Sequence, residues 1–562
     1  MRNFKCSIAD MRKQVFAEVA RLAYEGGDYR RMEKLPYKIV PGEVGNQRES
    51  IFLERAIVGE RIRLAMGLPL RPVAEHSLLS DGVEESAIAE KYYDPPLVNI
   101  IKYACNGCTP THYEVTNACQ GCLARHCQNA CPKGAIAIER GQAHIDQDKC
   151  IKCGKCRDAC SYHAIIKFTR PCQEACGMNA IGQDEYGHAK IDYDKCVSCG
   201  MCLVNCPFGA IVDKGQLFQL IHAIRRGDEV VAVIAPAFWG QFGDNVTPGQ
   251  IKAAMQQLGF AALEEVAVGA DLCAVEEAEE FLRMVPEKQP FMATSCCPAW
   301  VKYLENENPK YLKNISTCKS PMEMVGAIFR DKYAEKDAQD GRTTYHIAIM
   351  PCTAKKMEAA RLEFIHDGRP DVDLVLTTRE VIDMMQETGI QLGELELESP
   401  DLPFGLGSGA AVIYGTSGGV AEAVVRHCLP DKSKNALREI SILGLRGDAP
   451  IKEASVTIGD TELKLAVVNG LANAKKLLKE IDEGKKFYHL IEVMTCQGGC
   501  VGGAGQPYGL KKSKEKRGDG LHLSDNAAMF KRAERNPVVA QMMAEYGEER
   551  CHELLHVSYT SK

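Results

Sequence analysis

The chain has 562 residues, of which 45% are hydrophobic and 25% charged. This composition is typical of globular proteins and excludes a largely disordered or fibrous chain. The formal net charge of −7 excludes a global basic field that would attract nucleic acid or an anionic membrane. Residues 1–14 lack an apolar signal-peptide core, and no apolar run reaches membrane-spanning length. We therefore expect a cytoplasmic protein of several domains, without nucleic-acid or membrane partners and of unspecified oligomeric state.

Cysteine is the unusual component, with 26 residues. In a reducing compartment such a density indicates metal binding rather than disulfides. Sixteen of them lie between Cys105 and Cys206, whereas Cys6 is the only cysteine before this region. This change in cysteine content predicts a boundary between an N-terminal segment over residues 1–100 and a ferredoxin-like domain over 101–213. The N-terminal segment is expected to be helical, with one helix over residues 8–24. The role of the first segment is not evident from its sequence, and we expect it to contact the ferredoxin-like domain.

The cysteine-rich region contains an internal repeat. HIDQDKCIKCGKCRDAC at residues 144–160 recurs as KIDYDKCVSCGMCLVNC at residues 190–206. Each copy has the C-x2-C-x2-C-x3-C spacing of bacterial ferredoxins, in which three cysteines hold one 4Fe–4S cluster and the fourth reaches the neighbouring cluster. The region is therefore expected to consist of tandem modules with two clusters each.

Counting ligands predicts four accessory clusters. Three sets follow from the spacing: Cys119, Cys122, Cys127 and Cys160; Cys131, Cys150, Cys153 and Cys156; Cys176, Cys196, Cys199 and Cys202. Cys172 and Cys206 then form an incomplete set, and Cys105 and Cys108 are the cysteines left to complete it. The alternatives for this fourth set are a zinc knuckle at Cys105 and Cys108 or a vacant site.

The second half of the chain has an α/β pattern, expected as a catalytic domain over residues 214–510 and a C-terminal tail over 511–562. Apolar, β-branched runs separated by amphipathic stretches predict a largely parallel sheet, whose ligands would lie at the carboxyl ends of the strands. The expected strands cover residues 230–235, 346–350, 374–377, 411–414, 465–468 and 490–494.

Three cysteine motifs fit the ends of such strands: TSCCPAW at 294–300, MPCTAKKME at 350–358 and MTCQGGCVGGAGQP at 494–507. Pro298 suits a first helical position, which makes Cys297 the expected N-cap. A helix N-terminus favours a thiolate, and glycines let backbone approach a bulky ligand closely. Cys297, Cys352, Cys496 and Cys500 therefore form a possible ligand set for a further 4Fe–4S cube. The alternative is that these are buried, inert cysteines.

Together the three motifs resemble the signatures of the iron–iron (FeFe) hydrogenases. The resemblance implies a two-lobed catalytic domain wrapped by the C-terminal tail, and reversible reduction of protons to H2. It also implies an H-cluster, in which Cys500 bridges the cube to a two-iron subsite that carries CO, cyanide and a dithiolate. The implied partners are ferredoxin or a similar low-potential carrier and the hydrogenase maturation proteins.

The resemblance also implies roles for single residues. Cys296 would be the free thiol that passes protons to the subsite, and Lys355 would donate a charge-assisted hydrogen bond to a cyanide. Met350 and Met494 would surround the irons, and Pro236 and Ala237 would line the subsite. A proton route would continue through Glu277, Glu280 and Ser316. The alternative for the two glutamates, which are three apart on one helical face, is an ordinary solvated surface.

Several positions depart from the best-known members of this family, namely Ala504, Tyr414, Met322 and the pair Arg283 and Met284. Together with the absence of a plant-type 2Fe–2S motif before the clusters, they resemble the branch often named group B. Residues 552–556 read HELLH, a formal zinc-protease motif, but we expect a structural tail there. The competing functions are a hydrogenase-related iron–sulfur assembly or electron-transfer protein and a hydrogen sensor. Cys296 and Lys355 favour the enzyme.

Overall fold

The computed structural model describes residues 7–88, 94–242, 246–366, 368–399, 407–430, 444–458, 461–509 and 511–560. The chain begins with a helical segment, as predicted. The expected helix over residues 8–24 is part of α1 (Ser7–Glu25), which packs on α9 (Leu217–Arg226) and α15 (Thr378–Glu387) of the catalytic domain. The other helices of the segment are η1 (Tyr29–Lys34), α2 (Leu35–Ile39), α3 (Ile51–Ala65) and α4 (Val83–Ser86). Cys6 lies outside the described residues.

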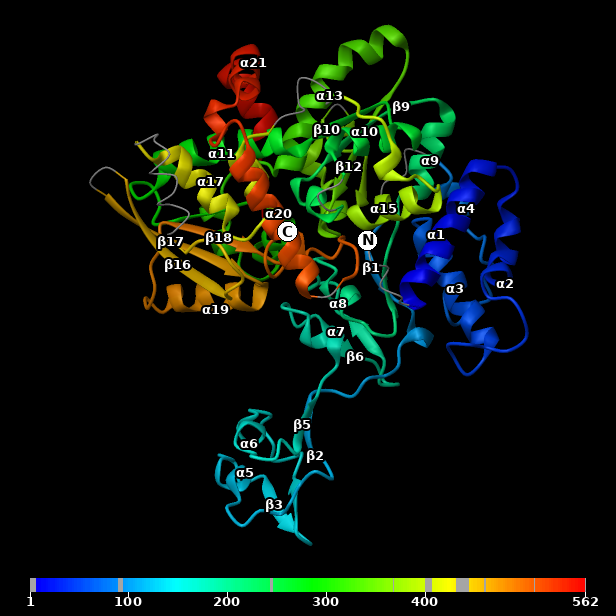
Figure 1. The fold of residues 1–562 in the computed structure, drawn as a ribbon, viewed down its shortest axis with the longest axis vertical. Helices are drawn as coiled ribbons and strands as arrows, with labels where there is room; N and C mark the ends of the chain where they lie inside the picture. Colours follow the sequence, from blue (N-terminus) through cyan, green and yellow to red (C-terminus); the bar gives the residue numbers. More distant parts are fainter. Residues whose placement is uncertain are drawn as a thin grey trace.

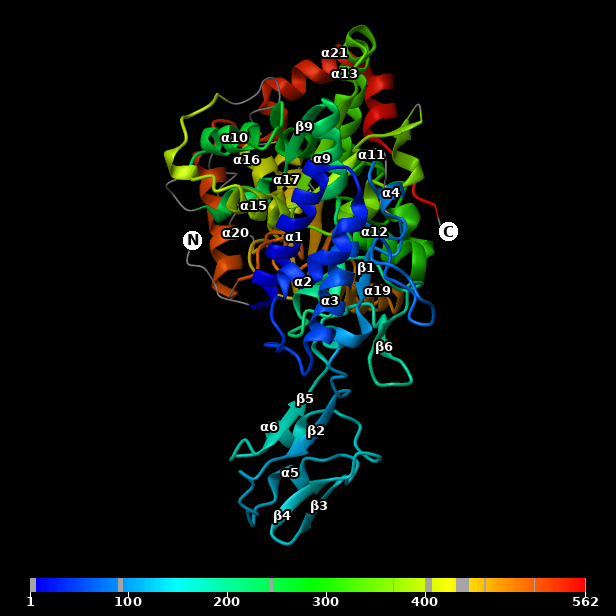
Figure 2. The same ribbon diagram turned by 90° about the vertical axis from the view of Figure 1, so that its right-hand side faces the viewer.

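The ferredoxin-like region forms two modules. The proximal module packs on the catalytic domain, whereas the distal module stands apart from the rest of the molecule in both side views (Figure 1, Figure 2). The distal elements are β2 (His112–Val115), α5 (His126–Asn129), β3 (Ile136–Glu139), β4 (Gln142–Ile145), α6 (Lys155–Asp158) and β5 (Ile165–Phe168). The proximal elements are β1 (Val98–Ile100), η2 (Lys102–Ala104), α7 (Pro171–Glu174), β6 (Ile181–Gln183), β7 (Ala189–Ile191), α8 (Met201–Val204) and β8 (Ile211–Asp213).

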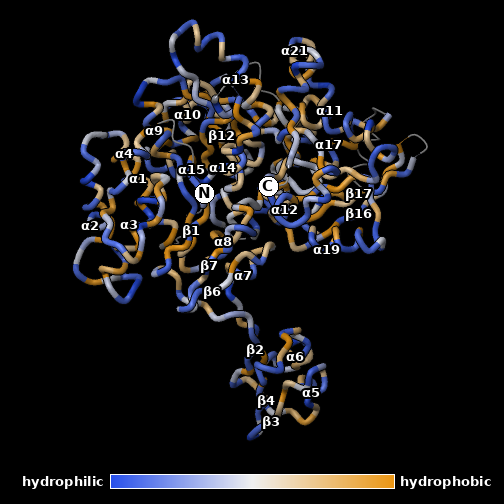
Figure 3. The backbone as a smooth tube through the Cα atoms, turned by 180° about the vertical axis from the view of Figure 1, so that it is seen from behind, coloured by the Kyte–Doolittle hydropathy of each residue, from blue (hydrophilic) through white to orange (hydrophobic). Residues whose placement is uncertain are grey.

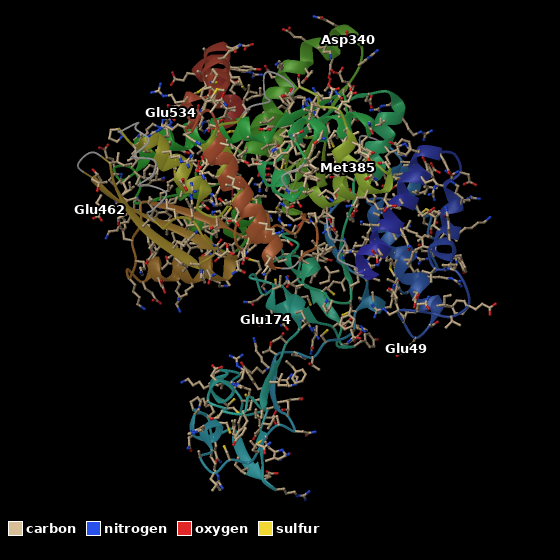
Figure 4. All side chains as sticks on the ribbon, viewed as in Figure 1. Glu49, Glu174, Asp340, Met385, Glu462 and Glu534 are labelled. Atoms are coloured by element: carbon tan, nitrogen blue, oxygen red, sulfur yellow. The ribbon has the colours of Figure 1, made fainter. Side chains whose placement is uncertain are left out.

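The antiparallel ribbon of β2 and β5 carries the chain into and out of the distal module. Glu174, labelled in Figure 4, marks the neck where this ribbon meets the proximal module. Its carboxylate accepts a hydrogen bond from Lys167 of β5 at 2.6 Å.

The first sheet of the catalytic domain is parallel and has the order β10-β9-β12-β15. Its strands are β9 (Glu229–Ile234), β10 (Ala262–Glu265), β12 (Thr344–Met350) and β15 (Leu374–Thr377). Val230 and Ile234 of β9 join the hydrophobic core on one face, and Val231 and Val233 join the core on the other. Burial on both faces explains why these strands are continuous apolar runs.

The second sheet is mixed and has the order β11-β18-β17-β16. The strands β11 (Met292–Ala293), β18 (Leu490–Met494) and β17 (Thr461–Asn469) run parallel, and β16 (Ile451–Ile458) is antiparallel to β17. In Figure 3 the hydrophobic colour gathers along β12 and β17, inside the two lobes.

Five of the six predicted strands are confirmed, and the strand over residues 411–414 is wrong. That run lies in α16 (Gly409–Val412) and η7 (Ile413–Gly415). The hydroxyl of Ser408 accepts a hydrogen bond from the Ala411 backbone N–H and caps α16. A short apolar run that is buried on all sides has no periodicity that separates helix from strand.

Helices cover both sheets and complete the domain. They include α10 (Pro248–Gln257), α11 (Val266–Met284), α12 (Pro298–Glu307), α13 (Pro321–Asp340), α14 (Ala354–Glu358), α17 (Gly419–Cys428) and α19 (Leu471–Asp482). Short elements connect them: η3 (Pro236–Gln241), η4 (Pro309–Asn314), η5 (Leu362–Phe364), β13 (Ile365–His366), β14 (Arg369–Pro370), η6 (Leu392–Glu394) and η8 (Cys500–Gly502). Within the described ranges, no helix has the length and apolar character needed to cross a membrane.

The C-terminal tail consists of α20 (Lys511–Ala527), η9 (Ala533–Arg535) and α21 (Pro537–Leu555). The end of the tail returns to the loop before α13. Lys319 N–H donates to the Leu555 carbonyl, and Val557 N–H donates to the Thr317 carbonyl, each at 2.8 Å. This docking explains why the last residues stay close to the catalytic domain.

Candidate active site

One cavity lies at the carboxyl ends of strands from both sheets. It is lined by residues that follow β9, β11, β12 and β18. Five cysteines of the three motifs line it, namely Cys296, Cys297, Cys352, Cys496 and Cys500, together with Cys199 of the ferredoxin-like region. The structure therefore gathers the three cysteine motifs, although they are separated by long stretches of sequence, in the place where parallel sheets bind ligands.

Local structure holds each cysteine in place. Cys297 is the N-cap of α12 with Pro298 after it, as predicted. Cys352 lies between β12 and α14, and Cys500 begins η8. The Gly505 N–H donates to the Pro351 carbonyl at 2.9 Å, which joins the loops that carry Cys500 and Cys352.

The glycines of the third motif allow this close approach of backbone to backbone. A Cβ atom on Gly503 would lie 2.1 Å from the Pro351 carbonyl oxygen, a distance that no side chain tolerates. A Cβ on Gly499, whose φ is +89°, would lie 2.5 Å from the Ser417 backbone nitrogen. Both positions need glycine, because the backbone of the third motif lies directly against the backbone of a neighbouring loop and leaves no space for a side chain.

Three of the four possible ligand thiols, those of Cys352, Cys496 and Cys500, are protonated unless a metal is bound. Burial raises the pKa of Cys352 to about 11 and that of Cys500 to about 12, and neighbouring thiols add to both shifts. Burial likewise raises the pKa of Cys496 well above its ordinary value. Clustered thiols of this kind become ligands when metal displaces their protons. The donor set thus fits an iron–sulfur cube on Cys297, Cys352, Cys496 and Cys500.

Cys296 faces the same cavity as the four possible ligands but precedes the α12 cap. Its side chain is buried, and burial raises its pKa well above the usual thiol range, with Glu277 adding to the shift. The free thiol is therefore uncharged and able to donate a proton.

Lys355 supplies a positive charge to the cavity wall. Its ammonium donates to a Glu358 carboxylate oxygen at 2.5 Å and to the Cys296 carbonyl at 3.3 Å. Burial by itself would lower the pKa of Lys355, but the carboxylates of Glu358 and Glu323 outweigh it and raise the pKa. The ammonium therefore remains charged in a largely apolar site.

The remaining wall is mostly apolar. Met350, Met494, Pro236 and Ala237 all line the cavity, as the resemblance implies. Two of the unusual positions, Met322 and Tyr414, line it as well. In the described structure the Tyr414 hydroxyl is buried without a hydrogen-bond partner.

Glu277 and Glu280 are buried in α11, so the alternative of a solvated face is wrong. The Ser316 hydroxyl donates to a Glu280 carboxylate oxygen at 2.8 Å. Neither carboxylate oxygen of Glu277 has a hydrogen-bond partner among the described residues. Burial, reinforced by Glu280, raises the pKa of Glu277 to about 8. A carboxyl with such a pKa exchanges its proton near neutral pH.

Sequence reasoning missed the outer end of this group. Thr317 donates to Glu280 through its hydroxyl at 2.9 Å, and the same hydroxyl lies 2.8 Å from His556 Nδ1. His556 Nε2 lies 3.2 Å from a Glu276 carboxylate oxygen. Both ring nitrogens are thus engaged by protein partners, which excludes a zinc site of the HExxH type. No local pattern could reveal a contact between residues 317 and 556.

The cysteines of the ferredoxin-like region also gather in sets. Burial raises the pKa of Cys127, and the neighbouring Cys160 and Cys122 add to it. Burial has the same effect on Cys156, to whose pKa Cys150 and Cys131 contribute. Cys196, Cys199 and Cys202 are neighbours of Cys176 in the same way. Cys199 also lines the central cavity, so this proximal set lies against the candidate active site.

The fourth set converges too. Cys105, Cys108, Cys172 and Cys206 line one small cavity. The Ala189 N–H donates to Cys105 Sγ at 3.4 Å, as the Ala143 N–H donates to Cys119 Sγ at 3.5 Å. Ala143 and Ala189 occupy equivalent positions of the repeat. Cys105 therefore takes, in the proximal module, the place that Cys119 has in the distal one.

Comparison with known proteins identifies the family. Residues 228–504 match the model described as "Iron only hydrogenase large subunit, C-terminal domain". Residues 188–211 match a "4Fe-4S binding domain" and residues 111–161 a "4Fe-4S dicluster domain". Iron hydrogenase 1 of Clostridium pasteurianum is 36% identical over 439 residues, which cover 74% of this chain and 75% of that protein. The chain therefore belongs to the FeFe hydrogenase large-subunit family and carries 4Fe–4S domains.

Other similarities agree with this family. NADP-reducing hydrogenase subunit HndD of Solidesulfovibrio fructosivorans is 37% identical over 370 residues, and the chain spans 63% of its length. A variant of the FeFe-hydrogenase HydA1 from Chlamydomonas reinhardtii superposes with a TM-score of 0.50 at 31% identity, over 59% of this chain and 94% of that one. Cytosolic iron-sulfur assembly component 3 of Bos taurus is 29% identical over 338 residues, 57% of this chain and 70% of that protein.

Proposed function

We propose that the protein is an FeFe hydrogenase that catalyses 2 H+ + 2 e− ⇌ H2. The observation that carries the proposal is the cavity itself, where a free, buried thiol faces four possible cluster ligands and a charged lysine. An assembly or electron-transfer protein would need the four ligand thiols but not Cys296 or Lys355. Similarity to an iron–sulfur assembly component keeps that function as the second candidate.

Cys297, Cys352, Cys496 and Cys500 would hold the H-cluster, which would supply the redox chemistry of the reaction. The chain itself holds and moves protons beside it. The Cys296 thiol presents a proton to the cavity, and Glu277 lies behind it with a carboxyl that exchanges protons near neutral pH. Ser316, Glu280 and Thr317 form a hydrogen-bonded series beyond Glu277. Lys355 offers N–H donors to an anionic group of the subsite, and the methionines exclude water.

Electrons would reach this cavity through four accessory 4Fe–4S clusters. We assign them to the sets of Cys119, Cys131, Cys105 and Cys176, in this order from the distal module to the cavity. Cys153 of the distal module is exposed to solvent, and most of the other cysteines of this module are partly exposed. This exposed end suits ferredoxin or a similar low-potential carrier as partner. Maturation proteins would have to insert the two-iron subsite. We also propose that the protein works in a reducing cytoplasm and that it belongs to the group B branch of the family.

The test is co-expression with the maturation proteins, followed by infrared spectroscopy and an assay of H2 evolution with reduced methyl viologen. We expect C≡O and C≡N bands and H2 production, together with iron for four accessory clusters and the H-cluster. A preparation with full cube occupancy but no such bands would favour the assembly-protein function instead. Iron that falls short by one cluster would refute the fourth accessory set without touching the active site.

A further inference from the structure

The N-terminal helical segment buries an arginine next to the fourth cysteine set. Arg61 of α3 is 4% exposed, and its Nη2 donates to the Gly209 carbonyl at 2.5 Å. Its Nε and Nη1 have no hydrogen-bond partner within the described residues. A buried guanidinium with unsatisfied N–H groups is costly unless an anion lies close by.

Gly209 links this arginine to the ligand set, because the residue whose carbonyl Arg61 contacts donates its own N–H to the Cys206 carbonyl at 3.1 Å. Burial lowers the pKa of Arg61 to about 10, the Cys206 thiol opposes this shift, and the cation Arg48 adds to it. Arg48 donates to the carbonyls of Ala104 and Phe208, which flank Cys105 and Cys206. A third guanidinium, Arg170, donates to the Cys108 carbonyl at 2.6 and 2.8 Å. Three arginines therefore contact backbone carbonyls of the segments that carry this set.

Helix α3 also packs over one side of the set, at Cys105 and Cys206. Ile57 and Leu64 share a hydrophobic cluster with Ala104, against which Cys105 and Cys206 pack. The contact leaves no spare room, since a Cβ on Gly209 would lie 2.9 Å from Arg61 Nη2. Within an apolar cover the electrostatic effect of a charge is larger than in water. In the distal module, residues 112–168, no arginine or lysine is buried in this way.

We propose that Arg61 is the counter-charge of a 4Fe–4S cluster on Cys105, Cys108, Cys172 and Cys206, and that the N-terminal helices thereby raise its reduction potential. This inference rests on the cluster assignment in the proposed function. When the cluster is reduced, one electron enters it from the reductant and no proton moves. Arg61 keeps its charge and stabilises the more negative reduced state, because the net charge around a cluster sets its potential.

The test compares Arg61→Gln with Arg61→Lys in the fully loaded protein, by redox titration followed with electron paramagnetic resonance. Arg63→Gln is the matched control. Arg63 lies on the same helix and is also 4% exposed, but it donates to the carbonyls of Pro69, Leu79 and Asp81, away from the cysteines.

We expect Arg61→Gln to shift one accessory signal to lower potential and to leave the other signals in place. Arg61→Lys, which keeps the charge, and Arg63→Gln should both leave that signal near its original potential. Should Arg61→Gln lose about four irons while Arg61→Lys keeps them, the counter-charge is again supported. Unmoved potentials in Arg61→Gln, an equal shift in Arg63→Gln, or iron loss in both Arg61 variants would overturn the inference.

The outcome is separate from that of the proposed function. The potential is measured on the accessory cluster, whereas the infrared bands report the two-iron subsite. Missing bands with a normal Arg61 effect would reject the enzyme and keep the inference. A wild-type protein that lacks the fourth cluster would reject the assignment and the inference together.

Discussion

Glu277 provides the sharpest test of the proton route. Its side chain is fully buried, and its pKa is raised to about 8, mainly by burial. At pH 7 a carboxyl with this pKa is about 90% protonated, whereas an ordinary one is protonated well below about 1%. Both protonation states of Glu277 are therefore populated near neutral pH, as proton transfer requires. The substitution Glu277→Gln keeps the shape of the side chain but removes the exchangeable proton.

We expect Glu277→Gln to load the cofactor normally and to lose about 100-fold or more of its H2 evolution. The infrared C=O band of a protonated carboxyl should disappear in the variant and, in the unsubstituted protein, should decline as the pH passes through about 8. Glu279→Gln is the matched control, because Glu279 lies on the same helix but is exposed. Normal turnover in Glu277→Gln, or a band that titrates in the ordinary carboxyl range, would refute the reasoning.

The same shift affects stability with a definite sign. As the pH rises from 4.5 to about 8, the unfolded chain ionises at Glu277 while the folded protein keeps its proton. The folded state therefore loses stability over this window, by about 5 kcal/mol at about 1.4 kcal/mol per pKa unit. Glu277→Gln lacks this loss, so its advantage in thermal stability over the unsubstituted protein should grow with pH.

Two further predictions concern the cavity. Cys296→Ser should retain the infrared bands and lose H2 evolution by about 100-fold or more, since a hydroxyl gives up its proton far less readily. Cys551→Ser, at a buried cysteine of the tail, should keep its activity per loaded cofactor, and full activity in Cys296→Ser would contradict the role of that thiol. Gly499→Ala should lower the iron content of the active site, because its Cβ would meet the Ser417 backbone. Gly518→Ala in α20, which has open space for a Cβ, is the control, and equal iron in both variants would count against this packing argument.

The sequence predicts a structural feature well where a short stretch of residues determines it, as in a fully buried strand, a helix cap or a set of cluster ligands. The strands β9, β12 and β18 are apolar throughout because both of their faces are buried, and the N-cap at Cys297 follows from Pro298 alone. Counting cysteines was enough to associate Cys105 with Cys206, because each cube needs four ligands.

Other features depend on contacts that no local pattern contains. The spacing of Glu277 and Glu280 places them on one helical face, but α11 happens to bury that face. The contact of Thr317 with His556 forms only when the tail docks. In the sequence Arg61 resembles any arginine on the surface of a helix, and only the packing of α3 against the cysteines distinguishes it.

The position of the fourth cysteine set, at the neck of the distal module, implies that a cluster bound there would also hold the two modules together. Cys105 and Cys108 lie on the chain as it enters β2, and Cys172 lies just after the chain leaves β5. A cluster held by both segments would cross-link them at the base of the ribbon, as a disulfide cross-links the two ends of a loop. The orientation of the whole distal module would then depend on iron at this one place. Removal of that cluster would interrupt electron transfer. It would also let the distal module, and any redox partner bound to it, move relative to the proximal module.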